Sequence, residues 1–418
     1  MSSFVNLERL SMDDPSTPDA MDIRLDARHP AFREDPHAIL DDLRARCPVH
    51  QDSVLDRVVL TRADDVAAVL ADRTLSSDPF KGRPTTYGRA GLTDADRPDL
   101  PLPFLDDPDH ARLRRLVVQA FSVRAVEALR PRIEAIAATL LDRIDPTRPF
   151  DLIADYAVPL PTLVIAIMLG IDDAEIEQFK AWSDAVLIGY APGRTEAEVR
   201  DRNAANDGLN DCIRRAIVER RREPRDDLIG ALTAAEAQGE RLSDIEILNT
   251  CRTLLVAGNV TTTDLIGNGS VALLRHPEQA ARLRADPGLW PAAIEEMLRY
   301  DPPVVSWNRQ CIDDRLIDGC PVEAGQTVTA MLLAANHDPA LHAAPHDFDI
   351  GRDRQKHHSF GGGAHFCLGA SLARLEAQVA LSALFDGFKQ LRLAPGHDLH
   401  RKAIPRFGGY ETVWLTAV

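Results

Sequence analysis

A loop with three glycines and one cysteine gives the strongest chemical signal in the sequence. It runs from His357 to Gly369 as HHSFGGGAHFCLG, and Cys367 lies just before a stretch, Ala370 to Phe385, that predicts a helix. Glycines allow such a loop to turn so that its backbone N–H groups point back at the sulfur. A thiolate presented in this way can be a metal ligand. The pattern therefore indicates a site where one cysteine of the protein binds a metal.

Other chemistries fit this loop less well. The glycines do not form a dinucleotide fingerprint, because the residue three places after Gly363 is Phe366. A zinc site would need a second cysteine within a few residues, which the sequence lacks. His365 and Cys367 leave a Cys–His nucleophile pair open, although such partners usually come from distant segments. A buried structural cysteine in a glycine turn is the simplest alternative.

The loop resembles the haem-binding loop of the cytochrome P-450 superfamily, whose bacterial soluble members are haem-thiolate monooxygenases. The family pattern Phe-Gly-x-Gly-x-His-x-Cys-x-Gly is met at Phe360, Gly361, Gly363, His365, Cys367 and Gly369. The resemblance implies that Cys367 is the axial ligand of haem b, and that Phe360, Gly361 and Gly369 also bind the cofactor. A thiolate ligand favours O–O bond cleavage, so dioxygen is implied as co-substrate.

Haem has two propionates, so its pocket needs cations at fixed positions. His110 and Arg114, at i and i+4, share one helix face and resemble the family's His-x-x-x-Arg over the propionates. Arg309 matches a further propionate arginine, and His357 matches another donor, although its neighbour His358 leaves that assignment open. Each of these residues alone would be a solvated charge. Together, by resemblance, they are expected to anchor haem.

An acid and a base at i, i+3, Glu296 and Arg299, lie in an expected helix from Leu289 to Tyr300. By itself this spacing indicates a surface ion pair worth about 0.2–0.5 kcal/mol. The family has Glu-x-x-Arg on a helix well before the cysteine, and an arginine after Phe-Asp-Ile, which Arg352 supplies here. The resemblance implies a structural Glu296–Arg299–Arg352 cluster in the layer beneath the haem.

The segment Ala257-Gly-Asn-Val-Thr-Thr262 lies inside a long helix that begins at a capping box, Ser243 with Glu246. Glycine inside a helix costs about 1 kcal/mol relative to alanine, and a flat ligand pressed against the helix is one reason to accept it. The segment resembles the family's oxygen-activation motif, Ala-Gly-x-Asp/Glu-Thr-Thr. This implies that Gly258 and Thr261 act at the oxygen site, Thr261 in proton delivery.

One position departs from that motif, because Val260 stands where the family has an acid. Valine can neither donate nor accept a proton, so the sequence predicts slow or leaky proton delivery, or an unusual oxidation. Asn259 and Asp264 are the nearest polar side chains that could substitute. Two alternatives to a monooxygenase stay open: a peroxygenase-like or otherwise atypical haem-thiolate oxidase, and a non-catalytic haem sensor.

By family position, the substrate pocket is expected from the loop 77–105, the helix near Trp182–Tyr190, and the residues Leu254, Ala257, Val304, Val305 and Ile404. Ordinary core packing is the alternative for each. Their types indicate a small apolar organic substrate, with hydroxylation or epoxidation as the reaction. The haem domain uses the chain's length, so electrons are expected from NAD(P)H through a separate ferredoxin reductase and ferredoxin. Arg112 and Arg115 are the expected docking patch on this acidic protein.

Composition limits the partners. The 418 residues have a net charge of −16, which argues against nucleic acid as the main partner. Six scattered cysteines show no disulfide framework and indicate reduced thiols. The N-terminus lacks the apolar run of a signal peptide, and no apolar stretch is long enough to predict a membrane span. These features predict a cytoplasmic protein with neither nucleic-acid nor membrane partners.

The elements that must position these residues are expected to be mainly helices, with a smaller β region. Residues 36–46 and most of 109–267 have helical patterns. Short strands are expected near 49–60, through 310–333 and again from 401 to 418. This combination predicts a mainly α chain with the cytochrome P-450 fold.

The domain layout follows from what the sequence lacks. No low-complexity linker divides the chain, so residues 26–418 are expected to form a single haem domain, after a loosely ordered N-terminal segment, 1–25. The stretch 77–105 is rich in Gly, Pro and Asp and predicts a long loop, a kind of element that is usually functional or disordered.

Overall fold

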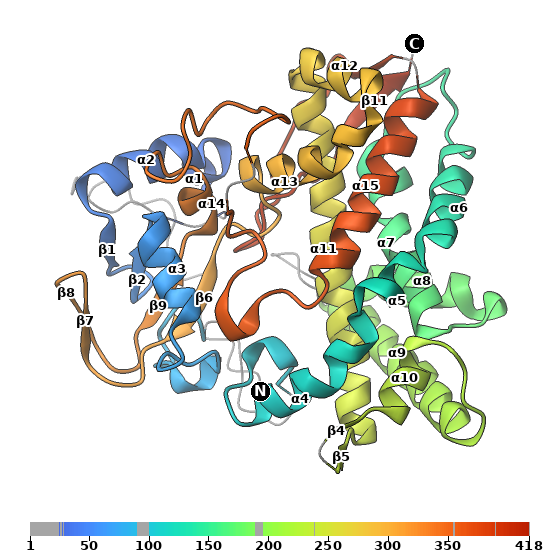
Figure 1. Ribbon diagram of the computed structural model, residues 1–418, viewed down its shortest axis with the longest axis horizontal. Coiled ribbons are helices and arrows are strands. Elements are labelled where there is room, and N and C mark those ends of the chain that lie inside the picture. Colours follow the sequence, from blue (N-terminus) through green and yellow to red (C-terminus); the bar gives the residue numbers. More distant parts are fainter. Residues whose placement is uncertain are drawn as a thin grey trace.

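The computed structural model describes residues 25–418, except Asp26, Arg28, 90–99, 189–194, Gln238, 354–355, Lys389 and Val418. The expected N-terminal segment therefore lies outside the described residues, apart from Leu25, which is buried. Helices dominate the described part, and most of the strands gather at one side of the molecule (Figure 1). Among these helices, none has the length and apolar character needed to cross a membrane.

Helices follow the predicted signals closely. The capping box of Ser243 and Glu246 starts α11, and Thr195 with Glu198 makes a second one at α9. The predictions for 36–46, for 109–267 and for the segment after Cys367 are confirmed. The α-helices are α1 (Pro30–Glu34), α2 (Pro36–Arg46), α3 (Ala63–Ala71), α4 (Asp109–Val117), α5 (Val123–Glu127), α6 (Arg130–Leu141), α7 (Pro159–Leu169), α8 (Ile176–Ile188), α9 (Glu196–Arg222), α10 (Leu228–Ala234), α11 (Asp244–Arg275), α12 (Pro277–Ala285), α13 (Trp290–Tyr300), α14 (Leu332–Asn336) and α15 (Ala370–Gly387).

Short 3-10 turns and one π turn connect these elements. The expected long loop contains two of them, at Pro79–Lys81 and Leu102–Phe104, while its middle, 90–99, lies outside the described residues. The remaining 3-10 turns and one π turn are at Val118–Phe121, Asp173–Glu175, Pro287–Leu289, Gly363–His365 and, for the π turn, Ile153–Ala157.

The sheets are small. The largest has the order β1-β2-β9-β6, with β2 and β9 parallel and the other pairs antiparallel. A second sheet has the order β10-β11-β3, and β4–β5 and β7–β8 are hairpins. The strands are β1 (Val49–Asp52), β2 (Arg57–Leu60), β3 (Phe150–Asp151), β4 (Glu236–Ala237), β5 (Glu240–Arg241), β6 (Trp307–Gln310), β7 (Arg315–Ile317), β8 (Cys320–Val322), β9 (Thr327–Ala330), β10 (Leu391–Leu393) and β11 (Trp414–Ala417).

Two strand predictions were wrong in part. The strands expected through 310–333 end at Ala330, and α14 follows, because a short run of apolar residues buried on every side fits a helix as well as a strand. Of the stretch 401–418, only β11 is a strand, since Pro405 and the pair Gly408-Gly409 interrupt regular pairing before it.

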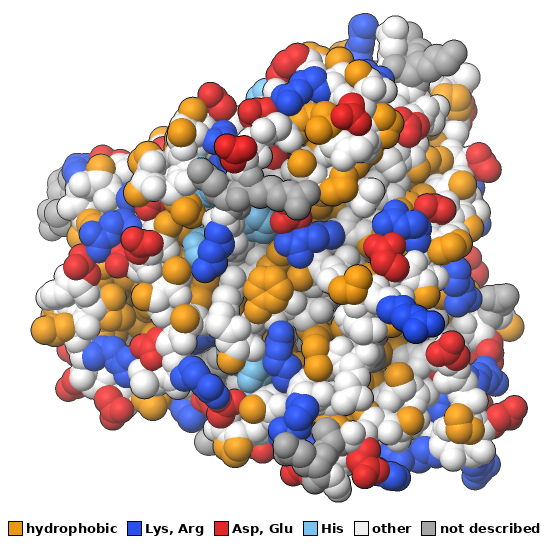
Figure 2. Space-filling model, viewed as in Figure 1, with side chains coloured by type: hydrophobic (Ala, Val, Ile, Leu, Met, Phe, Trp, Pro, Cys, Tyr) orange, Lys and Arg blue, Asp and Glu red, His pale blue; other side chains and the backbone are white. Residues whose placement is uncertain are grey.

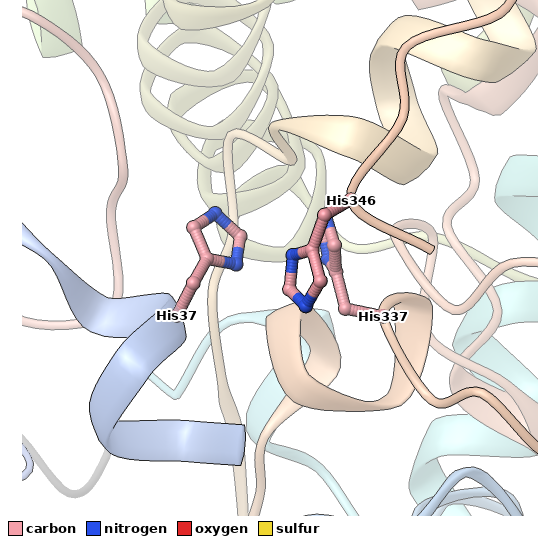
Figure 3. Close-up of side chains that lie close together, drawn as sticks. All are labelled: His37, His337 and His346. Atoms are coloured by element: carbon pink, nitrogen blue, oxygen red, sulfur yellow. The ribbon is translucent and has the colours of Figure 1, made fainter. Parts of the chain in front are cut away.

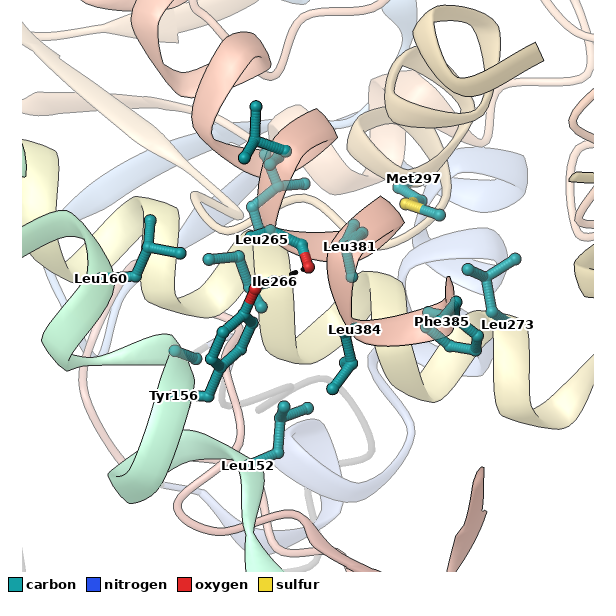
Figure 4. Close-up of a cluster of buried hydrophobic side chains, with 14 of the residues drawn as sticks. Leu152, Tyr156, Leu160, Leu265, Ile266, Leu273, Met297, Leu381, Leu384 and Phe385 are labelled. Atoms are coloured by element: carbon teal, nitrogen blue, oxygen red, sulfur yellow. Dashed lines mark hydrogen bonds between the residues drawn. The ribbon is translucent and has the colours of Figure 1, made fainter. Parts of the chain in front are cut away.

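The main hydrophobic core packs α11 against α7, α13 and α15 (Figure 4). Leu265 and Ile266 of α11 share this buried cluster with Leu381 of α15, and the hydroxyl of Tyr156 donates a hydrogen bond to the Ala380 carbonyl at 2.8 Å. Truncating a fully buried leucine to alanine costs about 2–5 kcal/mol. Because Cys367 lies three residues before α15, this core fixes the cysteine loop relative to α11.

Candidate active site

The cysteine loop is shaped by two glycines in the left-handed region. Gly361 has φ +70° and Gly363 has φ +62°, and a Cβ on Gly363 would lie 2.5 Å from the carbonyl oxygen of Leu70 in α3. Only glycine accepts both the backbone angle and the close approach. The N–H of Cys367 donates to the carbonyl of Phe360 at 2.9 Å, which closes the loop. The expected role of these glycines as turn formers is confirmed.

The Cys367 side chain is accessible, although protein surrounds the sulfur. Burial raises the pKa of its thiol, while the backbone N–H of Gly369 and the guanidinium groups of Arg114 and Arg374 act in the opposite direction. An N–H aimed at sulfur and nearby cations are the interactions that stabilise a thiolate. A positive metal centre would complete them. The surroundings of Cys367 therefore fit the metal-bound thiolate that the sequence predicts.

Two polar groups near the loop, the His110 ring and the Arg309 guanidinium, are buried with few hydrogen-bond partners. Among the described residues, Nε2 of His110 has no hydrogen-bond partner, and the side chain of Arg309 donates only to the carbonyl of Asn308, at 3.1 Å. Both residues are 2% exposed. Burial lowers the pKa of Arg309 to about 10, so this guanidinium stays charged at neutral pH. A buried cation without an anionic partner is costly, so these groups suit an acidic ligand.

His365 joins this group and was expected only as a motif residue. Its ring stacks on that of His110, with centroids 3.9 Å apart, and its Nε2 lies 2.9 Å from the hydroxyl of Ser77. Burial, with Arg309 nearby, lowers the pKa of His365 to about 3, so the ring is neutral. The sequence did not indicate Ser77, because its approach depends on how the long loop folds back.

Arg114 and His357 make contacts within the protein. The guanidinium of Arg114 donates to the carbonyl of Phe366 at 2.6 Å. His357 places Nε2 3.2 Å from a carboxylate oxygen of Glu295, which also accepts two hydrogen bonds from Arg374. Burial by itself would raise the pKa of Glu295, but Arg374 and His357 lower it to about 2. The predicted role of His357 as a propionate donor stays a prediction.

The Glu296–Arg299–Arg352 contact is confirmed. Arg299 donates from Nε and from a terminal nitrogen to the two carboxylate oxygens of Glu296, both at 2.8 Å, and Nε of Arg352 lies 3.3 Å from the same carboxylate. The spare donors of both arginines bind backbone carbonyls between Asn336 and Asp347. The sequence alternative, a surface pair, is wrong, since Glu296 and Arg299 are buried. The cluster fixes the chain that leads toward Cys367.

Gly258 in α11 faces α7. A Cβ at this position would lie 3.1 Å from Cδ1 of Ile165, so glycine allows the two helices to approach closely. Helix packing is thus one reason for glycine at this position, and the expected reason, a flat ligand against the helix, stays a prediction. Asn259 also points this way, because its buried amide donates to the hydroxyl of Thr162. Its side chain is thus engaged by α7.

Thr261 and Asp264 lie on a different side of α11. The Thr261 hydroxyl donates to the carbonyl of Ala257 at 2.6 Å, and Val260 beside it is half-buried. Asp264, one turn further along, is fully buried and accepts a hydrogen bond from Nζ of Lys402 at 2.6 Å. Burial raises the pKa of Asp264, although Lys402 opposes that shift. Among the described residues its second carboxylate oxygen has no partner.

Comparison with known proteins identifies the family. The model of the family described as Cytochrome P450 matches residues 53–287 and 289–404. The chain belongs to the cytochrome P450 family. It is 40% identical to the cyclomarin C epoxidase of Salinispora arenicola, covering 85% of this chain and 90% of the relative. It is 39% identical to the vitamin D(3) 25-hydroxylase of Pseudonocardia autotrophica, covering 88% and 90%.

The fold agrees with solved structures of the family. The cytochrome P450 CYP109Q5 from Chondromyces apiculatus superposes with a TM-score of 0.84 at 36% identity, over 94% of this chain and 98% of that one. The chain is thus a cytochrome P450 monooxygenase, a class that uses haem and dioxygen. The residues present fit haem, because a supported thiolate, an unpartnered His110 nitrogen and the buried Arg309 offer an axial ligand and partners for two carboxylates.

The expected substrate residues of this cytochrome P450 do not share one environment. Val305 is 8% exposed, packs with Met331 and Leu333 in a separate buried cluster and lines a cavity together with Lys402, so its assignment to the substrate pocket stays a prediction. Val304 beside it is half-buried, and neighbouring residues of an extended segment point to opposite sides. Leu254, Ala257 and Ile404 are also partly or fully accessible.

The expected docking patch, Arg112 and Arg115, stays a prediction. Arg112 forms an ion pair with Glu246, and Arg115 lies 3.0 Å from Glu240. Acidic side chains of the α11 start and of β5 thus compensate both charges. Elsewhere on the same face, Lys and Arg side chains gather around the middle, over the cysteine loop, while many Asp and Glu side chains lie toward the rim (Figure 2).

Proposed function

We propose that this enzyme inserts one oxygen atom of dioxygen into a C–H or C=C bond of a small apolar organic substrate, with Cys367 as the axial thiolate of haem b. The other oxygen atom leaves as water, which requires two electrons and two protons. Haem supplies the oxygen chemistry. The single observation that supports this proposal most strongly is the Cys367 sulfur, whose negative charge is favoured by the Gly369 N–H and by the guanidinium groups of Arg114 and Arg374, against the effect of burial.

His110, Arg309 and Arg114 are proposed to hold the propionates. Arg309 is buried and charged, and His110 offers an unpartnered ring nitrogen among the described residues. Neutralising a buried cation and satisfying a buried nitrogen both favour binding of a carboxylate. Phe360, Gly361 and Gly369 are proposed to keep the loop at the distance from the haem at which the thiolate can bind. Arg374 lies over the Phe360 ring at 4.4 Å and helps to fix it.

Proton supply is proposed to pass from Asp264 to Thr261, in place of the acid that Val260 replaces. Asp264 is the carboxylate one turn from Thr261 on α11, and it keeps one oxygen without a described partner. Its partner Lys402 lines a cavity of about 180 Å³, which Asp301 and Arg401 also line. This arrangement supports a polar connection between α11 and water. The oxidation is accordingly expected to need no external peroxide.

Electrons are proposed to come from NAD(P)H through a ferredoxin reductase and a ferredoxin that binds over the cysteine loop. Phe366 is 44% exposed there, beside Cys367, and Arg73 at the end of the neighbouring α3 is 70% exposed and forms an ion pair with Asp107. An apolar contact surrounded by cations suits an acidic partner. Lys356, directly before His357, is also exposed. A double variant, Arg73→Glu with Lys356→Glu, should slow reduction by ferredoxin about 10-fold at low salt. Arg148→Glu is the control, and equal rates in both variants would disprove this docking face.

The decisive experiment for the function is the absorption spectrum of the reduced, carbon-monoxide-bound protein. A thiolate ligand gives a strongly red-shifted Soret band, and an imidazole or absent ligand does not. Turnover of an apolar substrate panel with dioxygen, NADPH, a ferredoxin and its reductase then tests the reaction. A normal red-shifted band with product formed only from added peroxide would favour the peroxygenase alternative over the monooxygenase.

A further inference from the structure

Three histidines from separate segments meet on the side of the molecule where α2 packs against α14 (Figure 3). His37 is in the first turn of α2, His337 caps the end of α14, and His346 lies in the segment that follows. Each ring offers one nitrogen, and these three nitrogens all lie within 4.8 Å of one another. The described contacts of the haem site do not include them. Burial decreases from His337 to His37 to His346.

Hydrogen bonds fix which nitrogen of two rings is free. Nδ1 of His337 lies 3.1 Å from the carbonyl of Leu333, and a carbonyl only accepts, so Nδ1 holds the proton. Its Nε2 is buried and has no partner among the described residues. Nε2 of His346 lies 2.7 Å from a carboxylate oxygen of Asp41, which likewise only accepts. Each ring therefore presents its other nitrogen as a lone-pair donor when neutral.

The surroundings of His337 and His37 favour the neutral form of these two rings, which a metal requires. Burial lowers the pKa of His337 to about 2, with His37 and Arg299 adding to the effect. Burial also lowers the pKa of His37, although Asp301 opposes it. A neutral imidazole whose second nitrogen donates to a carbonyl or carboxylate is the usual form of a metal-binding histidine.

We infer that His37, His337 and His346 form a binding site for a divalent transition metal, with Zn²⁺ as the ion that the ligand set fits best. Three imidazoles with water as the fourth ligand make a tetrahedral zinc site. Such a site has nitrogens about 3.3 Å apart, at Zn–N distances near 2.05 Å. His37 and His346 lie at or near the surface, so rotation of their side chains can close the remaining gap.

The position of the site gives it a structural role. Arg299 and Arg352 hold the segment after α14 by its carbonyls, including that of Pro345, next to His346. The metal would tie this segment to α2, whose Asp41 lies one turn after His37 and orients His346. Because the site exists only in the folded chain, zinc would stabilise the native state. It would thus link the N-terminal helices to the layer beneath the haem.

Zinc titration of the haem-loaded protein, produced without a polyhistidine tag, tests this site. Isothermal calorimetry and metal analysis should give one Zn²⁺ per chain, with a dissociation constant of about 10 μM or below, and zinc should raise the melting temperature. His37→Asn and His346→Asn should each weaken zinc binding by at least about 10-fold. The matched control is His400→Asn, at an exposed histidine outside the cluster, which should bind zinc as the parent does.

Two further readouts separate a built site from incidental binding. Co²⁺ should give the intense visible bands of tetrahedral coordination in the parent and lose them in both cluster variants. Asp41→Asn, which removes the orienting carboxylate, should weaken zinc binding about 10–100-fold. The carbon-monoxide spectrum of every variant should match the parent, which shows that the fold is intact. Absence of stoichiometric zinc binding, or equal affinities for His37→Asn, His346→Asn and His400→Asn, would overturn the inference.

Discussion

The two sides of the haem site differ in how firmly the chain holds them. On the cysteine side, glycine angles, loop hydrogen bonds and the buried Glu296 cluster leave little freedom around Cys367. On the α11 side, the Thr261 hydroxyl donates to the Ala257 carbonyl of its own helix, and Val260 stands where the family has an acid. The position of Cys367 is thus specified by a rigid frame, whereas the oxygen and proton handling proposed for the α11 side would depend on a few replaceable side chains.

The largest expected effect is on the cysteine side. Cys367→Ala removes the only sulfur of the loop, so the red-shifted Soret band of the reduced carbon-monoxide complex and the monooxygenase activity should both be lost. Absorption spectroscopy after reconstitution with haem checks this. Cys320→Ala, at a partly buried cysteine of β8, is the control and should keep both. A red-shifted band that persists in Cys367→Ala would show that another residue is the ligand.

The frame beneath the cysteine should respond next most strongly. Glu296→Gln leaves Arg299 and Arg352 without their shared carboxylate, and breaking a buried ion pair in this way costs about 3–5 kcal/mol of unfolding free energy. Denaturant unfolding followed by circular dichroism measures the loss. Glu278→Gln in α12, at an exposed position, should change stability little. Similar values for both variants would mean that the cluster is not part of the rigid frame.

How well the sequence predicted each side follows from the range of the interactions. The capping box, the glycine turns and the Glu296–Arg299 spacing are local or follow the family's pattern, and the structure confirms them. The sequence could not show what tertiary packing decides. The side to which Val305 points, the packing reason for Gly258 and the ion pairs of Arg112 all depend on residues far away in the chain.

The histidine cluster shows the same limit more clearly. His37 is about 300 residues before His337 in the sequence, and no spacing rule for metal ligands covers such a separation. Only the packing of α2 on α14 brings the rings together. Ser77, which reaches His365 from the long loop, is a second residue of this kind.

A buried acid on the cysteine side makes stability depend on pH. Burial raises the pKa of Glu376 in α15 to about 8, and one of its oxygens has no partner among the described residues. Because the folded state holds this proton more tightly than the unfolded state, the stabilisation is complete below pH 4.5 and is lost as the pH rises toward 8 and above it. The slope contributed is on the order of 1 kcal/mol per pH unit.

Glu376→Gln should remove this slope. Its unfolding free energy relative to the parent should therefore increase steadily between pH 5 and pH 8, by on the order of 1 kcal/mol per pH unit. Denaturant unfolding at four pH values in this range measures the difference. Parallel stability curves for the parent and the variant would show that Glu376 titrates normally in the folded protein.

The smallest expected effect on the haem ligand, and the most informative one for chemistry, is on the α11 side. Val260→Asp restores the missing acid beside Thr261, so product formed per NADPH consumed should rise about two- to tenfold. Asp264→Asn as a single substitution should lower the product formed per NADPH consumed, because the proposed proton donor is lost. The same substitution should have a smaller effect when it is combined with Val260→Asp. Both variants should keep the red-shifted Soret band, since neither touches the cysteine side.

Unchanged coupling in Val260→Asp and in Asp264→Asn would mean that protons reach the oxygen site independently of both positions. A change in the Soret band would instead mean that the two sides are not separate, because a substitution on α11 would then alter the ligand that the cysteine loop provides.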